Sequence, residues 1–108
     1  MKGVIFSLIV TIVLIGCDKD NLDECDGTIR SFDNDVFPLM TNSCNTTGCH
    51  TTNFAAGDFT TYANVKEKVD NGSLAARVSD GSMPSNSVLT SEEKNIILCW
   101  IEEGALDN

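Results

Sequence analysis

The segment Cys44-Asn45-Thr46-Thr47-Gly48-Cys49-His50 is the part of this 108-residue chain around which we expect the fold to be built. Four residues separate its two cysteines, and a histidine follows the second cysteine directly. Two thiols and an imidazole therefore lie on one short segment. These side chains are commonly used to bind a metal or to attach a cofactor covalently. The remainder of the chain must indicate which of these chemistries applies.

Two cysteines followed by a histidine are typical of covalent c-type haem attachment. The thiols add to the haem vinyl groups as thioethers, and the histidine reaches the iron from one face. The usual spacer has two residues, whereas this chain has four. A longer spacer can work because both sulfurs need only reach one porphyrin edge. We therefore expect Cys44 and Cys49 to hold one covalent haem c, with His50 as an axial ligand.

A second axial ligand is required on the other face of the iron, and His50 is the only histidine of the chain. Methionine is the usual alternative, and it favours reduced iron. Met83 lies before Pro84 in a glycine-containing loop that could bring the thioether across the haem. Met40 lies on an expected helix face, four residues before Cys44, where a core position is expected. We predict that Met83 is the second ligand.

The N-terminal region predicts export. An apolar run from Val4 to Ile15 is short for a membrane span and is placed like the core of a signal peptide. It leads into Leu14-Ile15-Gly16-Cys17, which resembles a bacterial lipobox, in which cleavage precedes a lipidated cysteine. We expect a lipoprotein signal peptide at residues 1–16, lipidation of Cys17, an acidic tether at 17–28 and a domain at 29–108. The alternative is a plain anchor helix with an incidental cysteine.

Apolar residues recur at helical spacing, and no segment shows sustained strand alternation. The first expected helix runs from Ile29 to just before Cys44, with a break, a kink or a new turn near Pro38. Two short helices are expected at residues 61–69 and 73–78. The last helix should begin at a capping box, Thr90 with Glu93, and end near Gly104. These patterns predict an all-α domain.

The cysteine count allows a disulfide. Export implies an oxidising compartment, where disulfides persist. If Cys17 is lipidated and Cys44 and Cys49 hold haem, Cys25 and Cys99 remain, and a bridge between them would use every thiol. The sequence does not settle the pairing, because four cysteines allow three arrangements.

Three other classes of protein compete with a haem carrier. The segment could bind zinc with another ligand, although the spacing is atypical. The four cysteines could form two disulfides in a haem-free lipoprotein binding module. A haem enzyme or haem-based sensor would need an open iron site, which Met83 argues against. No acid–base constellation is visible in the sequence, so we predict that the protein is not an enzyme.

Four segments in order resemble the class I cytochromes c, especially small bacterial domains whose first helix runs into a C-x4-C-H motif. They are Pro38-Leu39-Met40, Cys44 to His50, Gly81-Ser82-Met83-Pro84 and Leu98 to Ala105. The resemblance covers about residues 29–106. It implies an all-α fold whose first and last helices cross beside the haem, and a function in one-electron transfer. The longer spacer and the extra cysteine pair depart from the family pattern.

Some expectations concern the surroundings of the haem and the partner. Apolar side chains that could surround the haem are Met40, Leu74, Val78 and Trp100, and donors for the haem propionates could be Arg77 and Tyr62. Without residues 1–16, six basic and sixteen acidic residues leave a net charge near −10. Such a surface disfavours nucleic acid and favours a redox partner with a basic patch, unless the acids only aid solubility. Glu102 and Glu103, where the helix dipole disfavours negative charge, are the docking candidates. The predicted location is the membrane, through the lipid, on the periplasmic side or at the cell surface.

Overall fold

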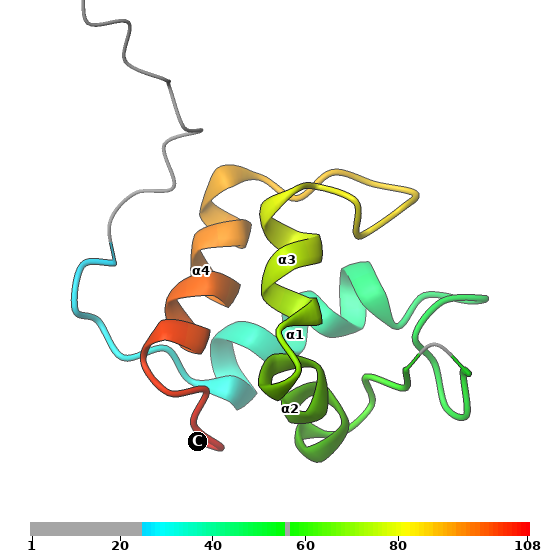
Figure 1. The fold of residues 1–108 in the computed structure, drawn as a ribbon, viewed down its shortest axis with the longest axis horizontal. Coiled ribbons are helices and arrows are strands. Elements are labelled where there is room, and N and C mark those ends of the chain that lie inside the picture. The colour runs from blue at the N-terminus through cyan, green and yellow to red at the C-terminus, as the bar shows by residue number, and fades with distance from the viewer. Residues whose placement is uncertain (1–24, 56) are drawn as a thin grey trace, which may run out of the picture.

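The computed structural model describes residues 25–55 and 57–108. This part of the chain forms helices and no strand, so it is all-α, as the sequence predicts (Figure 1). The elements, in order, are η1 (Phe32–Val36), α1 (Phe37–Leu39), η2 (Met40–Cys44), α2 (Tyr62–Asp70), α3 (Ser73–Ser79) and α4 (Ser91–Glu102). Within the described ranges, no helix has the length and apolar character needed to span a membrane. The predicted signal peptide, Cys17 and most of the predicted tether lie outside those ranges.

The first helical run begins later than the apolar periodicity predicts. Ser31 caps it, and its hydroxyl accepts a hydrogen bond from the backbone N–H of Asn34 at 3.1 Å. Serine is a favoured cap because its oxygen satisfies a backbone donor that the first turn leaves free. Ile29, at which the sequence predicts the start of this helix, precedes the cap and is 67 % exposed. That placement was wrong, because the local capping bond outweighs the apolar pattern.

Pro38 does not end the first helical run. The turns on either side of it have backbone hydrogen bonds from residue i to residue i−5. These bonds run from Phe37 N to Phe32 O and from Asn45 N to Met40 O. These are π-helical turns, which are wider than α-helical turns. The short α-helical segment that holds Pro38 begins at Phe37. The expected new turn is therefore present, and helicity continues through the proline.

The other three helices follow the predicted boundaries closely. Thr61 caps α2 by accepting a bond from Asn64 N. The capping box of α4 is formed in both directions, from Glu93 N to the Thr90 hydroxyl and from Thr90 N to the Glu93 carboxylate. This helix ends before Gly104, whose φ of +105° suits glycine better than other residues. Local hydrogen bonding therefore explains both ends of α4.

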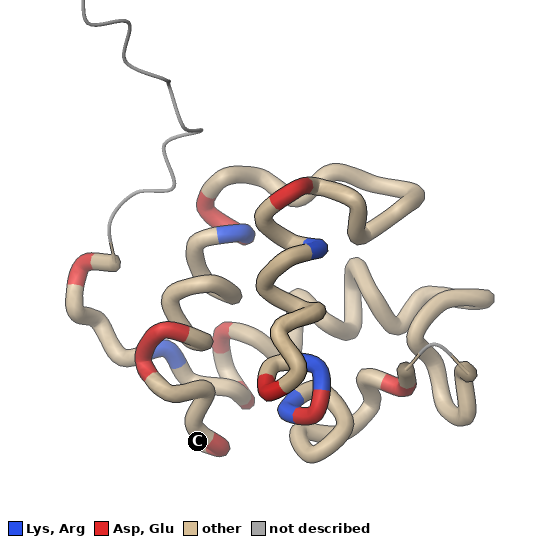
Figure 2. The backbone as a smooth tube through the Cα atoms, viewed as in Figure 1, with Lys and Arg blue, Asp and Glu red and all other residues tan. Residues whose placement is uncertain are grey.

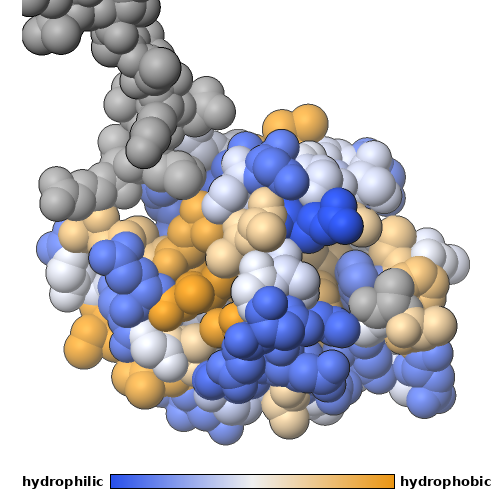
Figure 3. Space-filling model, in the orientation of Figure 1, coloured by the Kyte–Doolittle hydropathy of each residue, from blue (hydrophilic) through white to orange (hydrophobic). Residues whose placement is uncertain are grey.

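An aromatic cluster joins the first and last helical elements. The ring of Phe32 in η1 lies 5.5 Å from that of Trp100 in α4 and 5.1 Å from that of Tyr62 in α2. Trp100 Nε1 donates to Leu106 O, and the Tyr62 hydroxyl donates to Ala105 O. Aromatic burial of this kind supplies much of the stability of a small domain. On the face shown in Figure 3, apolar side chains gather over α4, whereas α2 presents hydrophilic ones.

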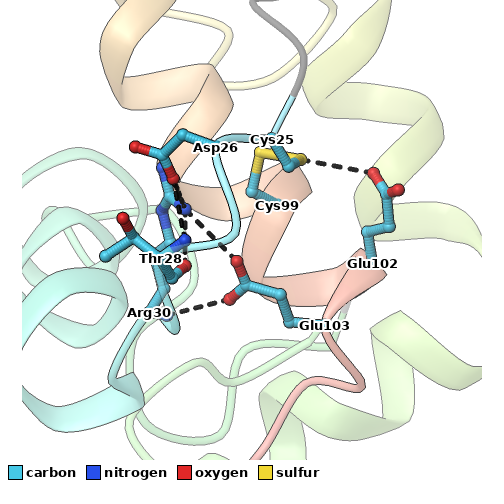
Figure 4. The surroundings of a disulfide bond; sticks show 7 residues. All are labelled: Cys25, Asp26, Thr28, Arg30, Cys99, Glu102 and Glu103. Atoms are coloured by element: carbon cyan, nitrogen blue, oxygen red, sulfur yellow. Dashed lines mark hydrogen bonds and ion pairs between the residues drawn. A yellow bond between two sulfur atoms is a disulfide. The ribbon is translucent and has the colours of Figure 1, made fainter.

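The segment before the first helix is attached to α4 (Figure 4). Cys25 and Cys99 are joined by a disulfide with their Cα atoms 5.6 Å apart. Arg30 then forms ion pairs with Asp26 at 2.9 Å and with Glu103 at 3.2 Å. Residues 25–28, the last part of the predicted tether, are thus held against the helical domain.

Candidate functional site

One cavity brings together the four residues that the sequence predicts to hold the haem. Its volume is about 440 Å³, within the range of roughly 300–1,000 Å³ that is usual for small-molecule sites. Cys44, Cys49, His50 and Met83 all contribute to its wall. Apolar walls come from Phe54, Phe59, Leu74 and Val78, and polar side chains from Ser43, Lys68, Asn71, Ser73, Arg77, Ser85 and Asn86. The cavity is therefore mainly apolar, with thiol, imidazole and thioether groups at its surface.

The segment that carries the two thiols is a compact loop at the end of η2. The backbone N–H of His50 returns to the carbonyl of Cys44 at 2.8 Å, and that of Cys49 bonds to Thr46 O at 2.9 Å. Gly48 has a φ of +81°, which glycine adopts without steric cost. These bonds close the four-residue spacer on itself. Both cysteines consequently meet the same cavity although the spacer is longer than usual.

Cys44 and Cys49 are free thiols, each half-buried. Burial raises the pKa of the Cys44 thiol to about 11, and the neighbouring Cys49 adds to the effect. A buried thiol in apolar surroundings is held in its neutral form because a thiolate would lose its hydration. Neither thiol takes part in the Cys25–Cys99 disulfide, so both are free for covalent attachment.

The ring of His50 is oriented by its neighbours. Nδ1 lies 2.6 Å from the carbonyl oxygen of Gly57. A carbonyl only accepts hydrogen bonds, so Nδ1 must carry the hydrogen, and in the neutral ring Nε2 keeps the free electron pair. The ring also stacks on Phe59, with centroids 4.1 Å apart, and meets the edge of Phe54 at 5.5 Å. This tautomer and this support are what a metal-ligating histidine requires.

The two internal methionines lie in different places. Met40 has no exposed surface and belongs to the hydrophobic core, outside the wall of the cavity. Met83 lies in the loop after α3, contributes to the cavity wall and is 39 % exposed. Its backbone N–H donates to Arg77 O at 3.2 Å, which anchors the loop to α3. Of these two thioethers, only that of Met83 lies at the cavity.

The expected haem surroundings are found in part. Leu74, Val78 and Arg77 line the cavity, but Met40, Trp100 and Tyr62 do not. The Tyr62 hydroxyl is bonded to Ala105 O at 2.8 Å instead, on the side of the aromatic cluster. Its proposed role as a propionate donor was therefore wrong. The C-terminal residues compete for that hydroxyl, and this long-range contact is not visible in the sequence.

Sequence reasoning missed three residues that shape the site: Gly57, Phe59 and Lys68. The Gly57 carbonyl accepts from His50, Phe59 supports the imidazole face, and the Lys68 side chain lies at the cavity wall. A Cβ at Gly57 would lie 3.0 Å from Lys68 Cε and 3.5 Å from His50 Nδ1. Glycine is often found where the backbone approaches another group closely. The glycine at position 57 was therefore the one feature of the sequence that could have indicated this contact.

The structure also bears on the two alternatives of a zinc site and of a second disulfide. In residues 25–55 and 57–108, no group of three or more His, Cys, Asp or Glu side chains converges in a way suited to a metal ion. The same ranges hold the Cys25–Cys99 disulfide and leave Cys44 and Cys49 unbridged. This donor set consists of two thiols, one imidazole nitrogen and one thioether around a mainly apolar cavity. These are the side chains that a covalently attached haem would use.

The acidic residues at the end of α4 differ from each other. Glu103 is partly buried and accepts hydrogen bonds from both the backbone N and Nη1 of Arg30, at 2.8 and 3.2 Å. Glu102 is exposed, and its Oε2 lies 3.3 Å from Cys25 Sγ (Figure 4). A disulfide sulfur carries no hydrogen, so this is a contact and not a hydrogen bond. Neither glutamate lines the cavity.

Comparisons with protein-family models, curated proteins and solved structures gave no match for this chain. The functional argument therefore rests on the residues and their geometry.

Proposed function

We propose that this protein is a monohaem c-type cytochrome, a one-electron carrier held by an N-terminal lipid on the outer side of a bacterial membrane. The observation that carries the proposal is the single cavity shared by Cys44, Cys49, His50 and Met83. These residues come from the end of η2, the loop after it and the loop after α3. The sequence resemblance to class I cytochromes c points to the same four residues.

Each of the four side chains has a role that its surroundings favour. Cys44 and Cys49 would hold the haem through thioethers, for which both thiols are free. His50 would offer Nε2 to the iron, because Nδ1 is committed to Gly57 O. Met83 would offer its sulfur from a different loop. The haem itself would supply an iron that gains and loses one electron.

The apolar walls also suit an electron carrier. Phe54, Phe59, Leu74 and Val78 would exclude water from the macrocycle, which limits the change in solvation when the iron changes charge. If His50 and Met83 both bound the iron, no position would be left for a substrate. That ligand set would suit one-electron transfer better than catalysis at the iron.

Haem content and attachment test the proposal directly. The exported protein should be heavier by one haem in mass spectrometry after acid–acetone extraction, and its pyridine haemochrome should have the band of a two-thioether haem. Cys44→Ala and Cys49→Ala should each leave at most one thioether and shift that band. The matched control Cys25→Ala should retain both thioethers, since Cys25 lies outside the cavity wall. A parent protein without haem, or one that loses it on extraction, contradicts the proposal.

A further inference from the structure

The wall of the cavity contains two basic residues and no acidic ones. Lys68 of α2 and Arg77 of α3 are its charged members. This is unexpected in a chain with 16 acidic and seven basic residues. The sequence has no Asp or Glu between Asp35 and Asp58, nor between Asp80 and Glu92, and these two stretches supply the remaining cavity loops. Figure 2 shows the Lys and Arg positions on α2 and α3. The charged side chains that line the cavity are thus both basic, although the protein as a whole is acidic.

The two cavity cations have weaker carboxylate contacts than Arg30 and Lys66. Arg30 is paired with two carboxylates, and Lys66 is paired with Asp70. Arg77 forms no ion pair within 4 Å among the described residues, and its one side-chain bond is to the Ser82 hydroxyl at 3.4 Å. An acidic neighbour of Arg77 is Asp80, whose carboxyl pKa is lowered first by hydrogen bonds from Ser82 and also by the charge of Arg77. Lys68 lies 3.7 Å from the exposed carboxylate of Glu67, beyond hydrogen-bond distance. Both cations therefore retain donors for an anionic ligand.

We infer that Lys68 and Arg77 bind the two propionate groups of the haem, an inference that rests on the proposed function. Haem carries its propionates on the porphyrin edge opposite the vinyl groups. In this cavity the thiols belong to η2 and the loop after it, whereas the cations belong to α2 and α3. Asn71 and Ser73 lie between Lys68 and Arg77 in the sequence, and they contribute neutral hydrogen-bonding groups to the same cavity wall. The thiols and the basic side chains of the cavity wall therefore come from different elements of the fold.

Lys68 is held in position by the site itself. Its Cε lies next to Gly57, only 3.0 Å from where a Cβ on that residue would be, and its side chain is 25 % exposed. Gly57 is also the acceptor for His50 Nδ1. One glycine therefore supports both the ligand imidazole and the lysine stem. This links the position of the propionate-binding cation to that of the axial ligand.

Propionate ionisation in the intact holoprotein tests the inference. Haem labelled with carbon-13 at the propionate carboxyls is followed by infrared spectroscopy during a pH titration. A nearby cation favours the ionised carboxylate, so Lys68→Gln and Arg77→Gln should each raise the pKa of one propionate by about one unit. Arg77→Lys should restore most of the parent behaviour because it keeps the charge. The double substitution should raise the pKa of both propionates.

The matched control is Lys66→Gln, which removes the same charge from α2 at a residue that is outside the cavity wall and paired with Asp70. It should leave both propionates unchanged. If Lys68→Gln and Arg77→Gln behave like this control while the haem remains covalently attached, the inference is wrong and the proposed function stands. If mass spectrometry finds no haem in the parent, the proposed function fails, and this inference fails with it.

Discussion

The imidazole of His50 lies flat against the ring of Phe59, with centroids 4.1 Å apart and planes 7° apart. The edge of Phe54 and the carbonyl of Gly57 hold the same imidazole from other directions. Three contacts thus fix a ring that could otherwise rotate about its side-chain torsions. Preorganisation of this kind keeps a ligand nitrogen in place without further loss of conformational entropy on binding.

Gly57→Ala should loosen this arrangement. Gly57 has a φ of +129°, and a Cβ there would crowd Lys68 Cε at 3.0 Å. Backbone strain in this region costs on the order of 1–3 kcal/mol. We expect a loss of about 2 kcal/mol relative to the parent protein, which lowers the melting temperature by roughly 10 °C in a domain of this size. Thermal unfolding measures the loss, and the haem spectrum reports any change at His50.

The control for that substitution is Gly72→Ala. Gly72 also has a positive φ, +79°, but a Cβ there would meet nothing within 4 Å. This control shows how much stability a Cβ costs at a positive φ when no neighbouring atom crowds it. Equal melting temperatures for the two variants would mean that crowding beside His50 has no energetic consequence.

Met83→Ala should leave the haem attached while removing the second axial ligand. A thioether favours ferrous iron, so the reduction potential should fall, on the order of 100 mV within the roughly 0.8 V range set by axial ligands. Carbon monoxide should bind the reduced variant readily and the parent slowly. Voltammetry and the near-infrared sulfur–iron band measure these effects. Met40→Leu is the control and should retain the band, because Met40 is a core residue; an intact band in Met83→Ala would exclude Met83.

Cys25→Ala should destabilise the domain without affecting haem attachment. The disulfide closes a loop between residues that are 74 positions apart. Restricting the unfolded chain over such a loop contributes about 4 kcal/mol in terms of chain entropy. Non-reducing peptide mapping should recover a Cys25–Cys99 crosslink, and denaturant unfolding should show the loss of stability. Two alkylatable thiols at these positions in the exported protein would show that the bridge is absent.

Glu103→Gln and Glu102→Gln should differ in stability. Glu103 accepts two hydrogen bonds from the largely buried Arg30, and loss of its charge should cost about 2 kcal/mol. Glu102 is exposed, so its substitution should stay within about 0.5 kcal/mol. Denaturant unfolding of the two variants measures the difference. This revises the expectation that the pair forms a docking site, since one member is engaged within the domain; equal effects on stability would contradict the structural role of Glu103.

Asp26 should make stability depend on pH in the acid range. Hydrogen bonds from Thr28 and then from Arg30 lower the pKa of its carboxyl from 3.8 to about 2. A lowered folded-state pKa means that the contribution is complete above about pH 4 and is lost as the pH falls towards 2. The difference in melting temperature between the parent and Asp26→Asn should therefore shrink over that interval. A difference that stays constant from pH 6 to pH 2 would show that the ionised carboxylate makes no contribution.

Much of the helical architecture could be predicted because its determinants are local. The Thr90–Glu93 capping box, the stop near Gly104 and the apolar spacing of Leu74 and Val78 all concern residues within a turn or two. The all-α class follows from the same patterns. The start of the first helix was misplaced at Ile29, since one hydroxyl at Ser31 decides the cap and the apolar pattern carries no information about it.

The candidate site likewise has features that are local in the sequence and features that depend on tertiary packing. That two thiols and the only imidazole of the chain share one short segment can be read directly from the sequence, because chain connectivity holds them together. Tertiary packing, in contrast, places Met83 and not Met40 at the cavity and makes Lys68 and Arg77 its cations. The same packing brings the Tyr62 hydroxyl to Ala105 O and the Glu103 carboxylate to Arg30. These contacts join residues far apart in the chain, and their formation depends on which helix faces pack together, a balance of burial and hydrogen bonding that no local pattern encodes.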